Sequence, residues 1–181
     1  MSTTTSTPNT SGLQPRLEDG RPMRIAGLRG HYTREQIDQI PEQWKRLIAM
    51  GEIPGRVGRV EWAFVVMGPN GADYLSGFEV ESDANLRAQF VTVEVPAHRC
   101  AIFPHEGHVS RMRFTFNAIF TEWLPASGYT VAPGPNGIPF CLERYGEKFD
   151  PQTKSGDIEI WVPVLDRNER ATPIYFQETN R

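Results

Sequence analysis

Hydrophobic and polar positions change their period along the chain in a regular order. Residues 23–28 are mostly apolar and predict a short strand, which should end at Gly30. The next apolar positions recur at helical spacing and predict one apolar helix face: Ile37, Ile40, Trp44, Leu47 and Ile48. Thr33 and Gln36 have the spacing of a capping box, and Pro41 predicts a kink or a restart in the first turn of the helix.

Strand-like runs follow this helix. Residues 61–67 and 74–80 are joined by Gly68-Pro69-Asn70-Gly71, a sequence typical of a turn, so the two runs are predicted to form a hairpin. Two further runs, 90–95 and 99–103, should close the first half of the chain and open the second.

The same order of elements then repeats. Ser110 is a candidate N-cap for a second amphipathic helix that should end at Leu124-Pro125. Its apolar face comprises Met112, Phe116, Ile119, Phe120 and Trp123. Two strands follow, at 140–145 and 157–164. The repeat predicts an α+β fold with helices on one face of an antiparallel sheet, and Trp44 and Trp123 are expected to be buried in its core.

The two ends of the chain have a different composition. Residues 1–22 are rich in Ser, Thr, Pro and Gly and nearly lack apolar side chains, which predicts a disordered N-terminal arm. The domain is expected to span residues 23–165, and residues 166–181 are expected to form a C-terminal tail.

Composition narrows the class of protein. The chain has 181 residues, 39% of them hydrophobic, and a formal net charge of −3, as expected for a globular domain that does not bind nucleic acid directly. No apolar run approaches the roughly 20 residues of a membrane helix, and no secretion signal is evident. Cys100 and Cys141 lie in apolar segments and should be buried thiols in a reducing compartment. We therefore expect a cytoplasmic, bacterial-type protein.

Candidate chemistry lies on the last two strands. Side chains alternate between faces, so Glu159 and Trp161 share one face of 157–164, while the isoleucines and valines of that strand should pack on the helices. Glu143 and Tyr145 likewise share a face of the preceding strand. If the strands pair, two carboxylates and two aromatic rings could converge on one surface suited to an organic cation. The alternative is an ordinary solvated sheet face stabilised by cross-strand pairs.

Other motifs give weaker signals. His105-Glu106-Gly107-His108 offers two histidines without an evident third ligand, so no metal site is expected. The sequence has no nucleophile elbow and no phosphate-binding loop. We expect no cofactor.

Several segments, in order, resemble the GyrI-like, or AraC-type, effector-binding family. The resemblance covers about residues 23–165. The segments that carry it are residues 24–28, Trp44, 73–80, 95–107, Glu122-Trp123-Leu124-Pro125, Ser127-Gly128-Tyr129, Glu143-Arg144-Tyr145 and 158–164.

The resemblance implies two β-α-β-β modules related by a pseudo-twofold axis, with a ligand groove between them. Members of the family bind lipophilic, often cationic compounds through a glutamate and aromatic side chains of the last two strands. The matching positions here are Glu143, Tyr145, Glu159 and Trp161, although relatives often carry Tyr at the position of Trp161.

The resemblance leaves three functions open. The chain is expected to lack a helix-turn-helix domain before Met23 or after Val164, which indicates the stand-alone branch of the family. Our first hypothesis is a protein that senses or sequesters an amphipathic small molecule. The second is a hydrolase of a reactive, cyclopropane-bearing compound, with Glu143 or Glu159 as general base and Tyr145 polarising the electrophile. The third is an interaction protein that acts on DNA gyrase or a regulator.

Overall fold

The computed structural model describes residues 13–83, 85–168 and 176–178. All strand pairs are antiparallel, and the main sheet has the order β1-β6-β9-β8-β3-β4-β2-β5-β10, with β7 paired to β9. The strands are β1 (Arg16–Asp19), β2 (Met23–Tyr32), β3 (Arg56–Gly68), β4 (Gly71–Val80), β5 (Val91–Val95), β6 (Arg99–His105), β7 (Tyr129–Val131), β8 (Phe140–Tyr145), β9 (Ile158–Asp166) and β10 (Phe176–Glu178).

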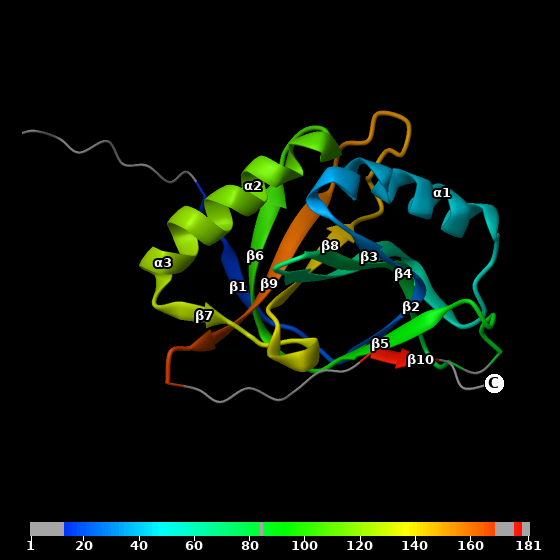
Figure 1. The fold of residues 1–181 in the computed structure, drawn as a ribbon, viewed down its shortest axis with the longest axis horizontal. Coiled ribbons are helices and arrows are strands. Elements are labelled where there is room, and N and C mark those ends of the chain that lie inside the picture. Colours follow the sequence, from blue (N-terminus) through cyan, green and yellow to red (C-terminus); the bar gives the residue numbers. More distant parts are fainter. Residues whose placement is uncertain (1–12, 84, 169–175, 179–181) are drawn as a thin grey trace, which may run out of the picture.

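The helical elements are short. They are η1 (Arg34–Gln39), α1 (Ile40–Ala49), η2 (Val109–Arg111), α2 (Met112–Ala118), η3 (Ile119–Trp123), α3 (Leu124–Ser127) and η4 (Pro135–Gly137). Helix α1 and the α2–α3 segment lie on the same side of the sheet and diverge from each other (Figure 1). The predicted α+β class with helices on one face is therefore confirmed.

The order of the strands shows an internal symmetry. The first module is β2-α1-β3-β4, and the second is β6-α2-β8-β9. In the sheet their strands run β6-β9-β8-β3-β4-β2, so equivalent strands occupy mirrored positions about the central β8–β3 pair. Strands β1 and β5 extend the two modules in the same way, one on β6 and one on β2. This arrangement confirms the two pseudo-twofold-related β-α-β-β modules.

The first helical segment begins and restarts as its sequence predicts. The capping box forms, with the backbone N–H of Thr33 donating to Oε1 of Gln36 at 3.2 Å. The 3-10 turn η1 then gives way to α1, which carries Pro41 in its first turn, where the missing N–H costs no hydrogen bond.

The second helical segment differs from the prediction at both ends. His108, not Ser110, is the N-cap residue, and its ring accepts the backbone N–H of Ser110. The segment does not end at Leu124-Pro125 but continues to Ser127. Pro125 has no N–H to donate, and the turn before it is π-helical, with the N–H of Leu124 reaching the carbonyl of Ile119.

The boundaries at the chain ends also need correction. Part of the expected disordered arm, Arg16–Asp19, forms β1 on the edge of β6, and part of the expected tail forms β10 on β5. All four side chains of β1 are exposed. Backbone pairing with β6 and an ion pair from Arg16 to Glu159 therefore hold a segment whose sequence has no apolar alternation. Residues 1–12 lie outside the described residues.

Both faces of the sheet carry buried side chains. Phe103, Ile160 and Val162 pack beneath α2 and η3 in one cluster, whereas Phe64 and Phe140 stack in another cluster on the opposite face. A third cluster holds α1 on the sheet. Both cysteines are buried free thiols as expected, and burial raises the pKa of Cys100 to about 12. No helix within the described ranges is long and apolar enough to cross a bilayer.

Candidate functional site

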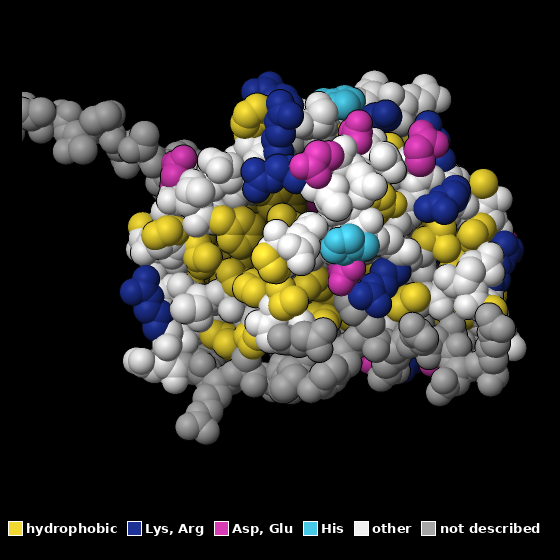
Figure 2. Space-filling view, viewed as in Figure 1, with side chains coloured by type: hydrophobic (Ala, Val, Ile, Leu, Met, Phe, Trp, Pro, Cys, Tyr) yellow, Lys and Arg dark blue, Asp and Glu magenta, His cyan; other side chains and the backbone are white. Residues whose placement is uncertain are grey.

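The two helical segments pack on opposite ends of the sheet, and the central strands lie between them. Helix α1 contacts β2 and β4. The α2–α3 segment packs on β6, where Thr115 and His105 form a 2.8 Å hydrogen bond and the rings of Trp123 and Phe103 meet edge to face at 5.0 Å. Figure 2 shows hydrophobic side chains gathered in a hollow on this side of the molecule, beneath α2 and α3. Strands β3 and β8 form the centre of the sheet, on the face that carries both helices.

Glu143 lies on this face of the central strands. It projects from β8 between Ala63 of β3 and Ile160 of β9, and only 7% of its surface is exposed. The hydroxyls of Tyr74 and Tyr145 donate to the same oxygen, Oε2, at 2.7 and 2.8 Å. Burial raises the pKa of Glu143, and the two hydrogen bonds only partly oppose that rise.

The other oxygen of this carboxylate is open. No donor from the described residues reaches Oε1 of Glu143. Among those residues, every side-chain nitrogen or oxygen that is sealed from solvent has a hydrogen-bond partner. Oε1 is therefore accessible, so a single buried carboxylate presents one fixed oxygen and one oxygen free for an external group.

Aromatic side chains surround the carboxylate. The indole N–H of Trp44 donates to the hydroxyl of Tyr74 at 3.0 Å, and the Trp44 ring lies edge-on to Tyr145 at 5.6 Å. Phe149 contacts Tyr145 from the other side at 5.0 Å. Burial and the charge of Glu143 hold the pKa of both tyrosines well above the usual value, so their hydroxyls stay protonated and donate.

A buried glutamine positions the helix that carries Trp44. The amide nitrogen of Gln43 donates to the carbonyl of Leu28 at 2.8 Å and to the hydroxyl of Ser76 at 3.0 Å. Its oxygen accepts the hydroxyl of Tyr32 at 2.8 Å. These bonds fix α1 to β2 and β4, and they therefore set the position of the neighbouring indole.

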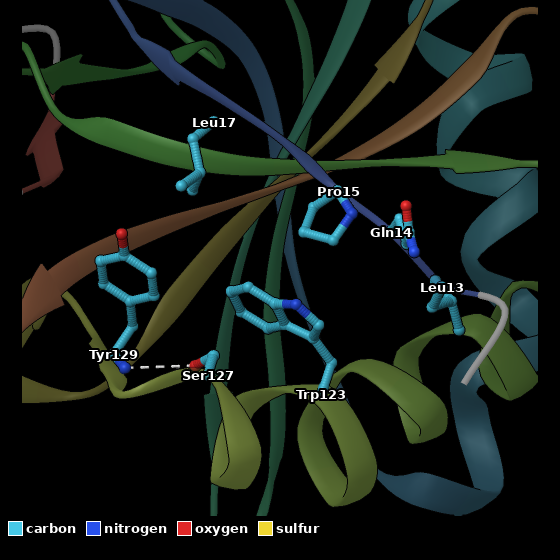
Figure 3. Close-up of a pocket in the computed structure, with 7 residues that line it drawn as sticks. All are labelled: Leu13, Gln14, Pro15, Leu17, Trp123, Ser127 and Tyr129. Carbon is cyan, nitrogen blue, oxygen red and sulfur yellow. Dashed lines mark hydrogen bonds between the residues drawn. The ribbon is translucent and has the colours of Figure 1, made fainter. Parts of the chain in front are cut away.

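A separate groove, lined in part by aromatic side chains, lies under α3. It has a volume of about 480 Å³ and is lined by Leu13, Gln14, Pro15, Leu17, Trp123, Ser127 and Tyr129 (Figure 3). The rings of Trp123 and Tyr129 stack at 6.2 Å, and Ser127 accepts the N–H of Tyr129 at 3.1 Å. The volume of this groove falls in the range of small-molecule pockets.

Both tryptophans predicted to be core residues are only partly buried. Trp44 donates a hydrogen bond to Tyr74, which in turn donates to Glu143, and Trp123 lines the groove under α3. The helical spacing correctly predicted an inward face, but neither indole is fully buried in the core.

A second carboxylate lies on the same face of the sheet as Glu143. Glu61 of β3 lies directly opposite Tyr145 in the β3–β8 pair and therefore on the same face. It is partly buried, and this burial raises its pKa despite the nearby charge of Arg56.

The four residues predicted to form the site do not converge. Strands β8 and β9 pair as expected, but Glu143 is opposite Ile160 and Leu142 is opposite Trp161. Cross-strand partners share a face, so Glu159 and Trp161 lie on the face away from the helices. The prediction that all four face one cavity is wrong, because the register places the face of Glu143 and Tyr145 with the buried isoleucines.

Glu159 and Trp161 have partners of their own. The Trp161 N–H donates to Glu159 at 2.9 Å, and Arg16 forms a 2.7 Å ion pair with the same carboxylate. Burial raises the pKa of Glu159, but the hydrogen bonds from Arg16 and Trp161 outweigh it and lower the net pKa. The Trp161 ring lies edge to face with Trp62 at 5.3 Å. This group joins β1 to β9.

Sequence reasoning missed Tyr74, Gln43 and Glu61. The signal for Tyr74 was present in the alternation of its strand, where it shares a face with Phe78 and Val80. Its contact with Glu143 depends on two strand registers, Tyr74 with Val65 and Ala63 with Glu143, which the sequence does not specify. Within the described part of the chain, no group of three metal-ligating side chains occurs.

The symmetric sheet, the paired helices and a buried glutamate between them define an effector-binding domain of the GyrI-like class. A family model described as "Cass2: Integron-associated effector binding protein" matches residues 16–164. The chain belongs to this family of integron-associated effector-binding proteins.

Two curated relatives match parts of the chain. The transcriptional regulator BrlR of Pseudomonas aeruginosa is 28% identical over 131 residues, which are 70% of this chain and 47% of BrlR. A DNA gyrase inhibitor of Erwinia billingiae is 41% identical over 61 residues, 32% of this chain and 34% of that protein. The chain thus spans about half the length of the first relative and a third of the second.

Solved structures share the fold. SAV2435 bound to tetraphenylphosphonium has a TM-score of 0.63 and 14% identity, with 84% of this chain and 94% of that chain covered. The integron cassette protein VCH_CASS2 from the mobile metagenome of Vibrio cholerae has a TM-score of 0.57 and 14% identity, with 84% and 97% covered. The C-terminal domain of EcmrR has a TM-score of 0.60 and 15% identity, with 86% and 99% covered.

Proposed function

We propose that this protein binds a lipophilic organic cation on the face of the sheet that carries α1 and α2, with Glu143 as the counter-charge. The observation that carries the proposal is the asymmetric state of this carboxylate. Oε2 is held by two tyrosine hydroxyls, whereas Oε1 is accessible and has no donor among the described residues. A cation that contacts Oε1 replaces the water that the buried charge has lost.

The surrounding rings support a cation rather than a neutral ligand. Trp44 and Tyr145 flank the carboxylate, and aromatic faces attract positive charge by ~0.5–2 kcal/mol each. The similar fold of SAV2435, whose structure holds tetraphenylphosphonium, makes that compound a suitable first probe. A protein that binds such a cation can act either by sensing the compound or by sequestering it.

The first test removes the charge of the site and keeps the shape of the side chain. Glu143→Gln keeps the shape and accepts the two tyrosine hydroxyls, but it removes the counter-charge. We expect it to weaken tetraphenylphosphonium binding by ~1–3 kcal/mol, measured by calorimetry, and to leave the melting temperature unchanged or higher.

A neutral compound of similar shape, triphenylphosphine oxide, is the matched ligand. Its affinity should differ little between the wild type and Glu143→Gln. Equal loss of both ligands would contradict a counter-charge role and indicate a general disturbance of the site.

Binding should also depend on pH. Burial raises the pKa of Glu143, so protons compete with a permanent cation at a higher pH than for an exposed glutamate. Affinity should be full above the raised pKa and fall below it, approaching about tenfold per pH unit. Titrations between pH 5 and pH 8 test this.

Glu143→Gln is the control for that profile, since Glu61 is a second titratable carboxyl on the same face. The profile of the variant should be nearly flat. A wild-type profile that is equally flat would rule out Glu143 as the titrating partner of the cation.

A hydrolase of a reactive small molecule is the second candidate. It is favoured by the raised pKa of Glu143, because a general base works best when its pKa is near the operating pH. For a hydrolase, Glu143→Gln should reduce turnover by ~10²–10⁴-fold while a neutral substrate still binds.

An interaction with gyrase or a regulator stays a prediction, since the similarity to the gyrase inhibitor covers only 32% of the chain.

A further inference from the structure

Glu61 is an unusual residue to find in the middle of a sheet. It lies between Phe78 of β4 and Tyr145 of β8, on the face that carries Glu143. The described residues provide it with no hydrogen bond and no ion pair within 4.0 Å, and Arg56 is the described cation whose charge lowers its pKa. A partly buried carboxylate without a donor loses hydration and gains little from the protein in return.

Arg56 is already engaged elsewhere. Its guanidinium lies 3.7 Å from the centroid of the Phe78 ring and donates to the carbonyls of Gly58 and Arg59 at 3.1 and 2.8 Å. Desolvation lowers the pKa of Arg56, as expected for a cation held against an aromatic ring. Glu61 therefore remains available to another cation.

The two glutamates of this face have a defined strand register. Glu61 is directly opposite Tyr145, and Glu143 precedes Tyr145 by two residues on β8. The two glutamates are thus diagonal neighbours in an antiparallel pair, with their Cα atoms about 7–8 Å apart. Tyr145 lies next to both, and its pKa is raised first by burial, then by the charge of Glu143 and, less strongly, by that of Glu61.

We infer that Glu61 is a second anionic subsite and that the site prefers dications whose two positive centres match the spacing of Glu61 and Glu143. The inference rests on the proposed function, because Glu143 supplies the first subsite. One end of the ligand takes the free oxygen of Glu143, and the other end takes the unpartnered carboxylate of Glu61.

A series of α,ω-bis(trimethylammonium)alkanes of increasing length tests this, with the singly charged alkyltrimethylammonium of equal length as the partner of each. Affinity should peak where the nitrogens are about 6–9 Å apart. At this length the dication should bind about tenfold more tightly than the monocation. Glu61→Gln should remove that advantage and leave the monocation unaffected, whereas Glu61→Asp should retain most of it.

The controls separate this inference from the proposed function. Glu147→Gln makes the same change of net charge at an exposed residue close in sequence, and it should alter neither ligand. If Glu143→Gln weakens both ligands but Glu61→Gln weakens neither, the second subsite is refuted and the first stands. If Glu143→Gln also has no effect on the monocation, the proposed function fails. Urea unfolding of each variant shows that the comparison is made on folded protein.

Discussion

Gly27→Ala should destabilise the protein by about 3 kcal/mol or more, or prevent its folding. A Cβ at Gly27 of β2 would lie 1.9 Å from the carbonyl oxygen of Ser76 and 2.6 Å from Cα of Gly77, both in β4. These are backbone atoms of a paired strand, so no side-chain rotation relieves the clash. The two strands would have to separate, and α1 is anchored to both of them through Gln43.

Gly68→Ala is the matched control. It adds the same methyl group to a strand of the same sheet, but its Cβ would lie 3.5 Å from the nearest atom, which is ordinary contact. Urea unfolding followed by tryptophan fluorescence should show little change for Gly68→Ala and a large loss for Gly27→Ala. Equal stability of the two variants would show that β2 and β4 can move apart more readily than the close backbone packing suggests.

The sequence was informative about elements that have a local pattern. The period of apolar residues located α1 and most strands, because each of these elements buries one side and the side chains record it. Phe140–Tyr145 was located with its observed bounds. The sequence did not predict strands β1 and β10. Both are short edge strands that pair through their backbones, and such pairing does not require an alternation of apolar residues.

The site was predicted only in part for a related reason. Alternation showed that Glu143 and Tyr145 share a face, and the resemblance to a known family pointed to both residues. Alternation within one strand does not say which face of the next strand lies beside it. The register of β8 against β9 decides that, and a shift of one residue would have put Trp161 beside Glu143.

Long-range pairing also explains the missed residues. Tyr74 comes to Glu143 across β3, through two successive strand pairs. The role of Trp44 became clear only from its hydrogen bond to Tyr74. The residues that contact a buried charge depend on the three-dimensional packing of distant segments. Periodicity predicts only whether a side chain faces inward.

Removal of both tyrosine hydroxyls should have the largest effect on the site. Tyr74→Phe combined with Tyr145→Phe leaves the Glu143 carboxylate buried and deprives it of the two donors that hold Oε2. Each lost hydrogen bond to a charged group costs ~1.5–3 kcal/mol, so the double variant should lose about 3–6 kcal/mol of unfolding free energy at pH 8. Both hydrogen bonds favour the ionised form, so the pKa of Glu143 should rise further in the variant.

The pH dependence of this loss identifies its cause. A carboxyl whose pKa is raised by folding binds more protons in the native state than in the unfolded state, so its ionisation destabilises the fold as pH rises through that window. The penalty of the double variant should therefore be smaller at pH 5, where Glu143 is closer to neutral, and grow toward pH 8. In a Glu143→Gln background the same two substitutions should cost much less at every pH. A penalty that is independent of both pH and the residue at 143 would mean that the hydroxyls stabilise the fold through partners other than this carboxylate.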